Sequence, residues 1–179
     1  MLESFIKFIE LGLYHILNSD SYDHILFVVL VSVPFLFKDW KRLLILISIF
    51  TLGHTFSLIL GIYNIINLKV NVTELLIPIT IFCIALFNIF TAGKTLFKQY
   101  NVVFVVILFF GLIHGLGFAN AFKNLVGSNS TLVAALEFAV GIEIGQIAVV
   151  IIVLILSFIC QNLFRFSKRD WILVVSSII

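Results

Sequence analysis

The chain has 179 residues, of which 62% are hydrophobic and only 11% charged, and its mean hydropathy is +1.24. Soluble domains carry about 45–50% apolar and about 25% charged residues, so this composition excludes a soluble protein. The formal net charge of +2 is too small to indicate nucleic-acid binding. The sequence therefore predicts an all-α, polytopic helical membrane protein that forms a single domain over residues 1–179.

The predicted elements begin with an amphipathic helix over residues 1–20, which is too polar to span a bilayer and is expected to lie at the membrane interface. The run Asn18-Ser19-Asp20-Ser21 ends this helix and offers N-caps to the next one. Five apolar stretches of about spanning length follow, and the start of a sixth makes about five to six transmembrane helices. The five cover residues 22–37, 43–63, 73–91, 101–122 and 131–158. Residues 171–179 are too short to span, so either the chain continues or this segment only dips into the membrane.

Lysine and arginine are distributed unevenly between the two ends of these predicted spans. Eight of them follow the first, third and fifth spans, namely Lys38, Lys41, Arg42, Lys94, Lys98, Arg165, Lys168 and Arg169. The opposite side holds three, Lys7, Lys69 and Lys123. Basic residues collect in the short cytoplasmic loops of membrane proteins. We therefore expect a multi-pass protein of the bacterial inner membrane with its N-terminus outside.

Polar side chains inside the spans gather in the outer half of the membrane. At a rise of about 1.5 Å per residue, His54 and His114 lie roughly 14 and 12 Å below the outer ends of their helices. On the same scale, Glu137 and Glu143 lie roughly 9 and 18 Å below the outer end of theirs. The inner half shows almost no polar side chains, so inward release of a bound ion would need a conformational change.

Further candidate ligands stand at the start of the chain, with Asp23 and His24 at the outer mouth of the first span and His15 near the interface. Imidazole nitrogens and carboxylate oxygens suit a divalent transition metal such as Ni²⁺, Zn²⁺ or Co²⁺. A lone buried histidine is more often a packing residue, whereas ionisable residues at lipid depth favour a functional site. Gln146 either orients a ligand or bonds a neighbouring helix. The predicted metal ligands are His24, Asp23, His54, His114, Glu143, His15, Glu137 and Gln146.

Small residues at a spacing of four surround two of these candidates. Gly111 and Gly115 flank His114, and Gly141 and Gly145 flank Glu143. This spacing places two glycines on the same side of a helix, where the backbone of a neighbouring helix can approach closely. We expect these positions to be helix-packing contacts.

Four separated motifs follow one another from residue 12 to about residue 150. They are His15 with Asp23-His24-Ile25-Leu26-Phe27, then Phe50-Thr51-Leu52-Gly53-His54-Thr55, then Phe110-Gly111-Leu112-Ile113-His114-Gly115-Leu116-Gly117-Phe118-Ala119, then Gly141-Ile142-Glu143-Ile144-Gly145-Gln146. Together they resemble the HupE/UreJ membrane proteins, a family associated with nickel supply to hydrogenase and urease as permeases or accessory proteins. The resemblance places the family's first histidine signature on His15, Asp23 and His24. It places the later motifs on His54, on His114 and on Glu143 with Gln146.

The favoured interpretation is a permease or metal-uptake accessory protein, with nickel as the first choice of ion. Its expected partners are the metal ion and the lipid bilayer, and a homo-oligomer stays open. One alternative is a membrane-embedded hydrolase in which Zn²⁺ with an open position activates water. Another is an electron-transfer protein with haem held by His54 and His114. An enzyme is therefore left open but is less favoured.

Overall fold

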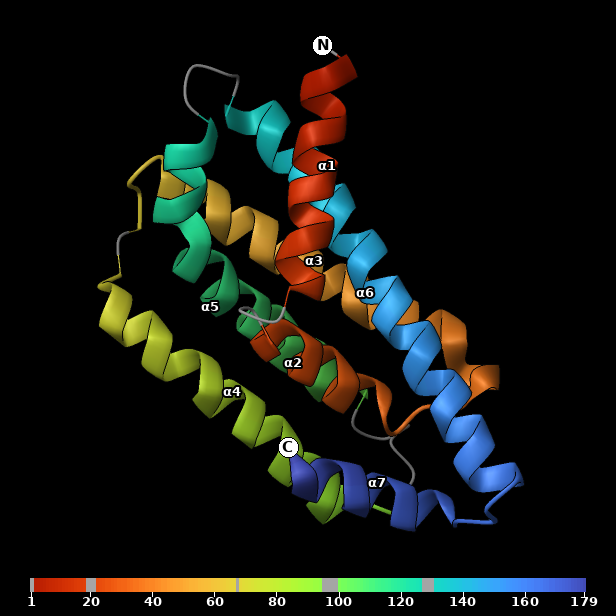
Figure 1. Ribbon diagram of the computed structural model, residues 1–179. Coiled ribbons are helices and arrows are strands. Elements are labelled where there is room, and N and C mark those ends of the chain that lie inside the picture. Colours follow the sequence, from red (N-terminus) through yellow and green to blue (C-terminus); the bar gives the residue numbers. More distant parts are fainter. Residues whose placement is uncertain (1, 19–21, 67, 95–99, 127–130) are drawn as a thin grey trace.

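The structure is a computed structural model that describes residues 2–18, 22–66, 68–94, 100–126 and 131–179. These residues are organised as helices, as predicted, and include no strand. The elements are α1 (Leu2–Leu17), α2 (Tyr22–Ser32), the 3₁₀ turn η2 (Phe37–Asp39), α3 (Trp40–Ile62), α4 (Val70–Thr91), α5 (Tyr100–Val126), α6 (Thr131–Asn162) and α7 (Lys168–Ile178) (Figure 1).

Four helices are long and apolar enough to cross a bilayer, namely α3 with the preceding η2 turn, α4, α5 and α6. Their bounds lie within four residues of the predicted spans. α2 is also apolar, but it has 11 residues and ends at Ser32, five residues before its predicted end. Pro34 explains the early end, since proline donates no hydrogen bond and disfavours helical backbone in the residue before it. The chain is a multi-pass membrane protein.

α1 is part of the helix bundle, whereas the sequence predicts that it lies at the interface. It packs along α6 (Figure 1), and a Cβ on either Gly12 or Gly141 would meet backbone atoms of the other helix. Phe8 is buried in this contact region, while Lys7 and Glu10 are exposed. An amphipathic pattern indicates that one face is apolar, but it does not say whether that face meets lipid or another helix.

α1 and α2 follow one another through the bundle as two short helices. α1 ends at Leu17 near the middle of the bundle, and α2 begins there at Tyr22 and continues toward the other end (Figure 1). Interrupted helices occur at membrane depth where they line a site inside the protein. The two helices together run the length of the bundle, and α3, α4, α5 and α6 then follow in alternating directions (Figure 1).

α3 and α5 lie against each other along much of their length. Glycines make this possible, because a Cβ on Gly111 would meet the carbonyl oxygen of Phe50 and one on Gly115 would meet that of His54. The predicted close packing at these glycines is confirmed. Because glycine has no side chain, the two backbones can approach closely at such a crossing. The residues beside the glycines then lie close to the partner helix.

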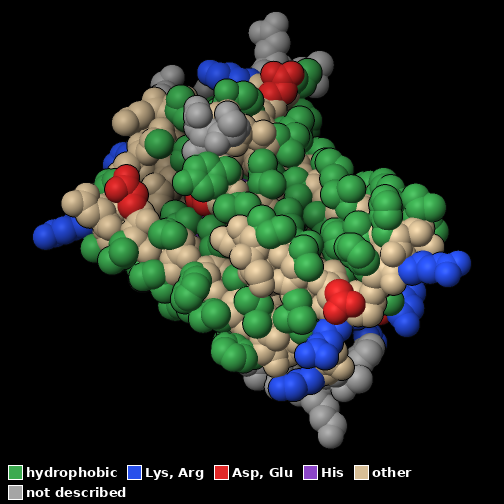
Figure 2. All heavy atoms as spheres, turned by 60° about the horizontal axis from the view of Figure 1, so that its bottom comes forward, with side chains coloured by type: hydrophobic (Ala, Val, Ile, Leu, Met, Phe, Trp, Pro, Cys, Tyr) green, Lys and Arg blue, Asp and Glu red, His purple; other side chains and the backbone are tan. Residues whose placement is uncertain are grey.

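The two ends of the bundle differ in charge. α7 packs against α4 and α6 at one end (Figure 1), where all but one of the eight basic residues predicted for the inner side lie. The exception, Lys98, lies outside the described residues. Figure 2 shows a broad hydrophobic surface between the basic side chains of the two ends. Trp171 and Ile172 of α7 are buried while Lys168 and Arg169 are exposed, as suits a helix lying at the interface.

Candidate metal centre

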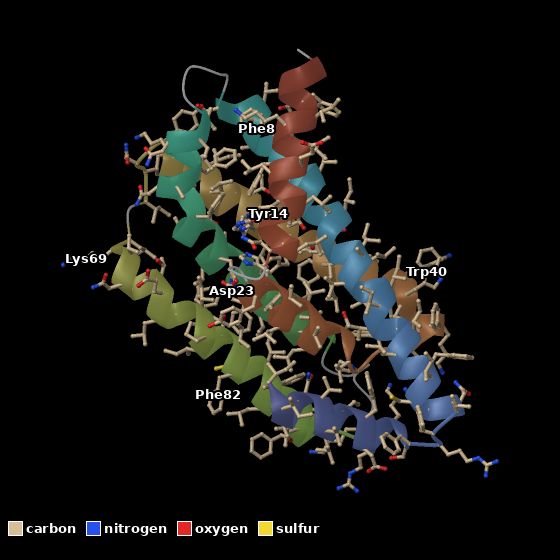
Figure 3. All side chains as sticks on the ribbon, viewed as in Figure 1. Phe8, Tyr14, Asp23, Trp40, Lys69 and Phe82 are labelled. Carbon is tan, nitrogen blue, oxygen red and sulfur yellow. The ribbon has the colours of Figure 1, made fainter. Side chains whose placement is uncertain are left out.

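Four histidines from four helices meet where α1 gives way to α2. His15 lies in the last turn of α1 and His24 in the first turn of α2, so the interruption brings them together. His54 of α3 joins them, since one ring nitrogen from each of the three lies within 4.8 Å of the other two. The ring centroids of His24 and His114, from α5, are 5.2 Å apart. Figure 3 places Asp23, the neighbour of His24, near the middle of the bundle beside these helices.

Phenylalanine rings pack against the four imidazoles. The ring centroids of Phe118 and His15 are 4.2 Å apart, and those of Phe50 and His114 are 5.3 Å apart. None of the four histidines is more than 9% exposed. In such apolar surroundings charges are weakly screened, and a buried imidazole that lacks a partner is costly.

Hydrogen bonds orient two of the imidazoles through Nδ1. The Nδ1 atom of His24 lies 3.0 Å from Oδ1 of Asp23, and the Nδ1 atom of His114 lies 2.9 Å from the carbonyl oxygen of Phe110. An acceptor at Nδ1 favours the tautomer with its proton there, which leaves the lone pair of Nε2 for another ligand. The same Asp23 oxygen also accepts a hydrogen bond from the backbone N–H of His24. Asp23 therefore acts on the histidine group through His24.

Five of the other ring nitrogens of the group are buried without a hydrogen-bond partner. Among the described residues these are Nε2 of His15, His24 and His114 and both nitrogens of His54. Native proteins pair the large majority of their buried polar atoms, so five unpaired nitrogens in one place need an explanation. A divalent cation would pair with several of them at once. Neutral imidazoles are the ligands that nickel, zinc and cobalt accept.

The two helix ends at the site have opposite electrostatic effects on a cation. The carbonyl groups at the C-terminal end of α1, next to His15, favour positive charge. The N-terminal end of α2 disfavours it, and the carboxylate of Asp23 in the first turn of α2 offsets that effect. The interruption therefore presents a carboxylate and a helix C-terminus close to the four imidazoles.

Glu143 and Gln146 belong to a neighbouring polar group on α3 and α6. The carboxylate of Glu143 accepts hydrogen bonds of 2.6 Å from the hydroxyl groups of both Ser48 and Thr51. The Thr51 hydroxyl also lies 3.0 Å from Oε1 of Gln146, whose Nε2 is buried without a partner. Along α3, Thr51 and Ser48 lie roughly 4.5 and 9 Å from His54 on the side of the basic end. Polar side chains thus continue from the histidine group along α3 and α6 toward the basic end.

Glu137 lies apart from both groups. It is partly exposed on α6 and forms no hydrogen bond or ion pair with any residue that the structure describes. Of the eight predicted ligands, the four histidines meet, Asp23 contacts His24, and Glu143 and Gln146 share a group with Ser48 and Thr51.

Comparison with known proteins agrees with the arrangement of these motifs. The family model described as "HupE / UreJ protein" matches residues 1–179. The chain belongs to the HupE/UreJ family. Neither the curated proteins nor the solved structures give a match.

Two polar residues of this HupE/UreJ protein were missed by reasoning from the sequence. Ser48, Thr51 and His54 recur every three residues, which makes Thr51 a neighbour of both Ser48 and His54 on the surface of α3. That spacing was the one indication in the sequence that Ser48 and Thr51 belong with His54. Hydroxyl groups in apolar helices often bond their own backbone, as Thr51 does with the carbonyl oxygen of Ile47 at 3.1 Å, so the spacing alone did not distinguish them.

The depth of His24 also differs from the prediction. The sequence suggests that Asp23 and His24 lie at the outer mouth of the first span. In the structure His24 lies beside His54 inside the bundle, because α1 precedes α2 along the same path through the bundle. The histidines of this HupE/UreJ protein thus form one group inside the bundle.

Proposed function

We propose that this HupE/UreJ protein binds a divalent transition-metal ion, nickel before cobalt or zinc, and serves as a permease or metal-uptake accessory protein of the bacterial inner membrane. The observation that carries the proposal is the group of four buried imidazoles with five unpaired ring nitrogens. The family supports a role in metal supply. The ion is the cargo of the protein.

In this proposal His15, His24 and His54 hold the ion, and His114 contributes a fourth nitrogen. Asp23 keeps Nε2 of His24 available and adds a negative charge next to the site, which lowers the cost of a dication in apolar surroundings. Cys83 is exposed on α4 and Cys160 lies near the C-terminal end of α6, so neither thiol joins the histidines. A nitrogen-rich site of this kind suits nickel and zinc better than copper(I).

Passage toward the basic end would use the polar group of Ser48, Thr51, Glu143 and Gln146. These side chains supply oxygen atoms within two helical turns of His54. The carboxylate of Glu143 would attract the ion. When no ion is present, the carboxylate accepts hydrogen bonds from the hydroxyl groups of Ser48 and Thr51. Transport therefore needs a smaller rearrangement than an entirely apolar inner half would require.

The alternatives have less support. A hydrolase needs its substrate to reach a metal-bound water, whereas no histidine of the group is more than 9% exposed. Haem would need a flat space between His54 and His114. The ring of Phe50 lies 6.1 Å from His54 and 5.3 Å from His114, centroid to centroid, so it takes up space that a haem would need.

Uptake of ⁶³Ni²⁺ into proteoliposomes tests the proposal. Wild-type protein should accumulate the ion, and His54→Ala should abolish accumulation because it removes one of the three histidines whose ring nitrogens lie within 4.8 Å of one another. Thr55→Ala is the matched control, since Thr55 is buried next to His54 on α3 with its hydroxyl unpaired. Glu143→Gln should retain binding but slow uptake. Uptake by His54→Ala equal to that of wild type would contradict the role of the histidines.

A further inference from the structure

A cavity of about 640 Å³ lies between α2, α4, α5 and α7, separate from the histidine group. Apolar side chains such as Leu30, Ile84, Phe87 and Ile107 form its wall, and none of the eight predicted metal ligands lines it. Its volume lies within the range of about 300–1,000 Å³ that is usual for ligand sites. Cys83 of α4 also lines the cavity and is exposed.

One end of the cavity is strongly basic. Arg42 of α3, Lys94 after α4, and Lys168 and Arg169 of α7 line it, and Asp39 is the single acidic residue among the described residues of the lining. Four positive charges and one negative charge give this end a formal charge of +3. The cavity therefore combines an apolar chamber with a cationic end, which matches the two parts of an anionic amphiphile.

Neighbouring residues define the surroundings of two of these cations. The stem of Arg169 packs over Gly93, where its Cδ and Cγ atoms lie 3.5 and 3.8 Å from the position that a Cβ would take. Burial lowers the pKa of Lys168, the carboxylate of Asp39 opposes that shift, and Lys38 adds to it. The charged form of a lysine in these surroundings is stabilised when another anion approaches.

We propose that this cavity binds one anionic glycerophospholipid of the inner leaflet. Its acyl chain would lie against the apolar wall and its phosphate among Arg42, Lys94, Lys168 and Arg169. Basic pockets between transmembrane helices on the cytoplasmic side are suited to anionic head groups. α7 lies across this end of the bundle, at the level where head groups are found. The choice of leaflet depends on the orientation inferred from the basic residues, whereas the binding site itself does not.

Native mass spectrometry of the full chain in detergent tests this proposal. The protein is titrated with phosphatidylglycerol and, separately, with phosphatidylcholine of the same acyl chains. We expect one phosphatidylglycerol per chain to bind more tightly than phosphatidylcholine. Lys168→Gln with Arg169→Gln should weaken phosphatidylglycerol binding by roughly 25-fold, because each basic side chain near an anionic head group contributes about a factor of five.

The matched control is Lys41→Gln with Arg165→Gln, which removes the same charge from exposed positions at the same end outside the cavity. This pair should bind phosphatidylglycerol as wild type does. Ile84→Trp fills the apolar chamber, keeps all four cations, and should also lose binding. Equal affinity for the two lipids, an equal loss in the control pair, or displacement of the lipid by an equal concentration of glycerol phosphate would overturn the proposal.

Discussion

Asp23 and the carbonyl group of Phe110 each accept a hydrogen bond from the Nδ1 of a histidine, but they differ in charge. Both contacts favour a free Nε2 on His24 and His114. The carboxylate also adds a negative charge close to the position of the proposed ion. The two histidines are therefore not equivalent, and Asp23 is the contact whose loss we expect to matter more.

Replacement of Asp23 by alanine should weaken Ni²⁺ binding about 10- to 100-fold, the usual effect of losing the partner that orients a histidine ligand. Isothermal titration calorimetry of purified protein measures the change. Glu74→Ala is the control, since Glu74 is an exposed carboxylate on α4. If both variants keep the wild-type affinity, Asp23 does not act on the site.

Residue types at the site were predictable, but their distances were not. His54 and His114 are distinctive in the sequence because an ionisable side chain at lipid depth is expensive. His15 lies in an amphipathic stretch where a histidine costs little. Only the fold brings it within 4.6 Å of His24, centroid to centroid, since α1 ends and α2 begins in the middle of the bundle.

At the scale of helices, the crossing of α3 and α5 sets the separation between His54 and His114. Gly115 lies against the carbonyl oxygen of His54, so the two backbones touch at His54 and next to His114. Gly117, two residues later, is less confined, and a Cβ there would lie 3.4 Å from Cδ1 of Ile77. These two glycines of the same motif are thus expected to tolerate substitution differently.

Gly115→Ala should destabilise the protein by about 1–3 kcal/mol, because its Cβ would overlap backbone that has no room to move. Nickel affinity should fall with it, since α3 and α5 would be forced apart. Thermal unfolding in detergent measures stability, and Gly117→Ala should stay close to wild type. An unchanged unfolding midpoint for Gly115→Ala would show that the crossing is looser than the structure indicates.

The spans themselves were predictable from long apolar runs, whose cost in water leaves a bilayer as the only suitable environment. By contrast, the sequence did not predict that the amphipathic helix α1 packs against α6. Gly12 and Gly141 are 129 positions apart in the sequence, and nothing in either local pattern pairs them. Their contact depends on the arrangement of α1 and α6 in the whole bundle.

At the scale of the molecule, the N-terminus of α1 and the basic end lie at opposite ends of the helix bundle (Figure 1). α1 and α2 together lead from one end to the other, and α7 lies at the end where α6 finishes. Positive residues at that end predict that it faces the cytoplasm. In this orientation the histidine group lies above Thr51 and Ser48 on the route inward.

Single cysteines test this orientation. In a Cys83→Ser, Cys160→Ser background, Asn124→Cys at the end of α5 should react with a membrane-impermeant maleimide in intact cells. Arg165→Cys, beyond α6, should react only after permeabilisation. Labelling in the reverse order would place the basic end outside and invert the proposed direction of uptake.

X-ray absorption spectroscopy at the nickel edge tests the central claim most directly, because it identifies the atoms bound to the ion. We predict a nitrogen-rich shell with multiple scattering from three or four imidazoles in the wild-type protein. In His15→Ala the number of imidazoles should fall by one. A shell of oxygen atoms without imidazole scattering, or a spectrum that is the same in His15→Ala and His54→Ala as in wild type, would contradict a metal site built from these four histidines.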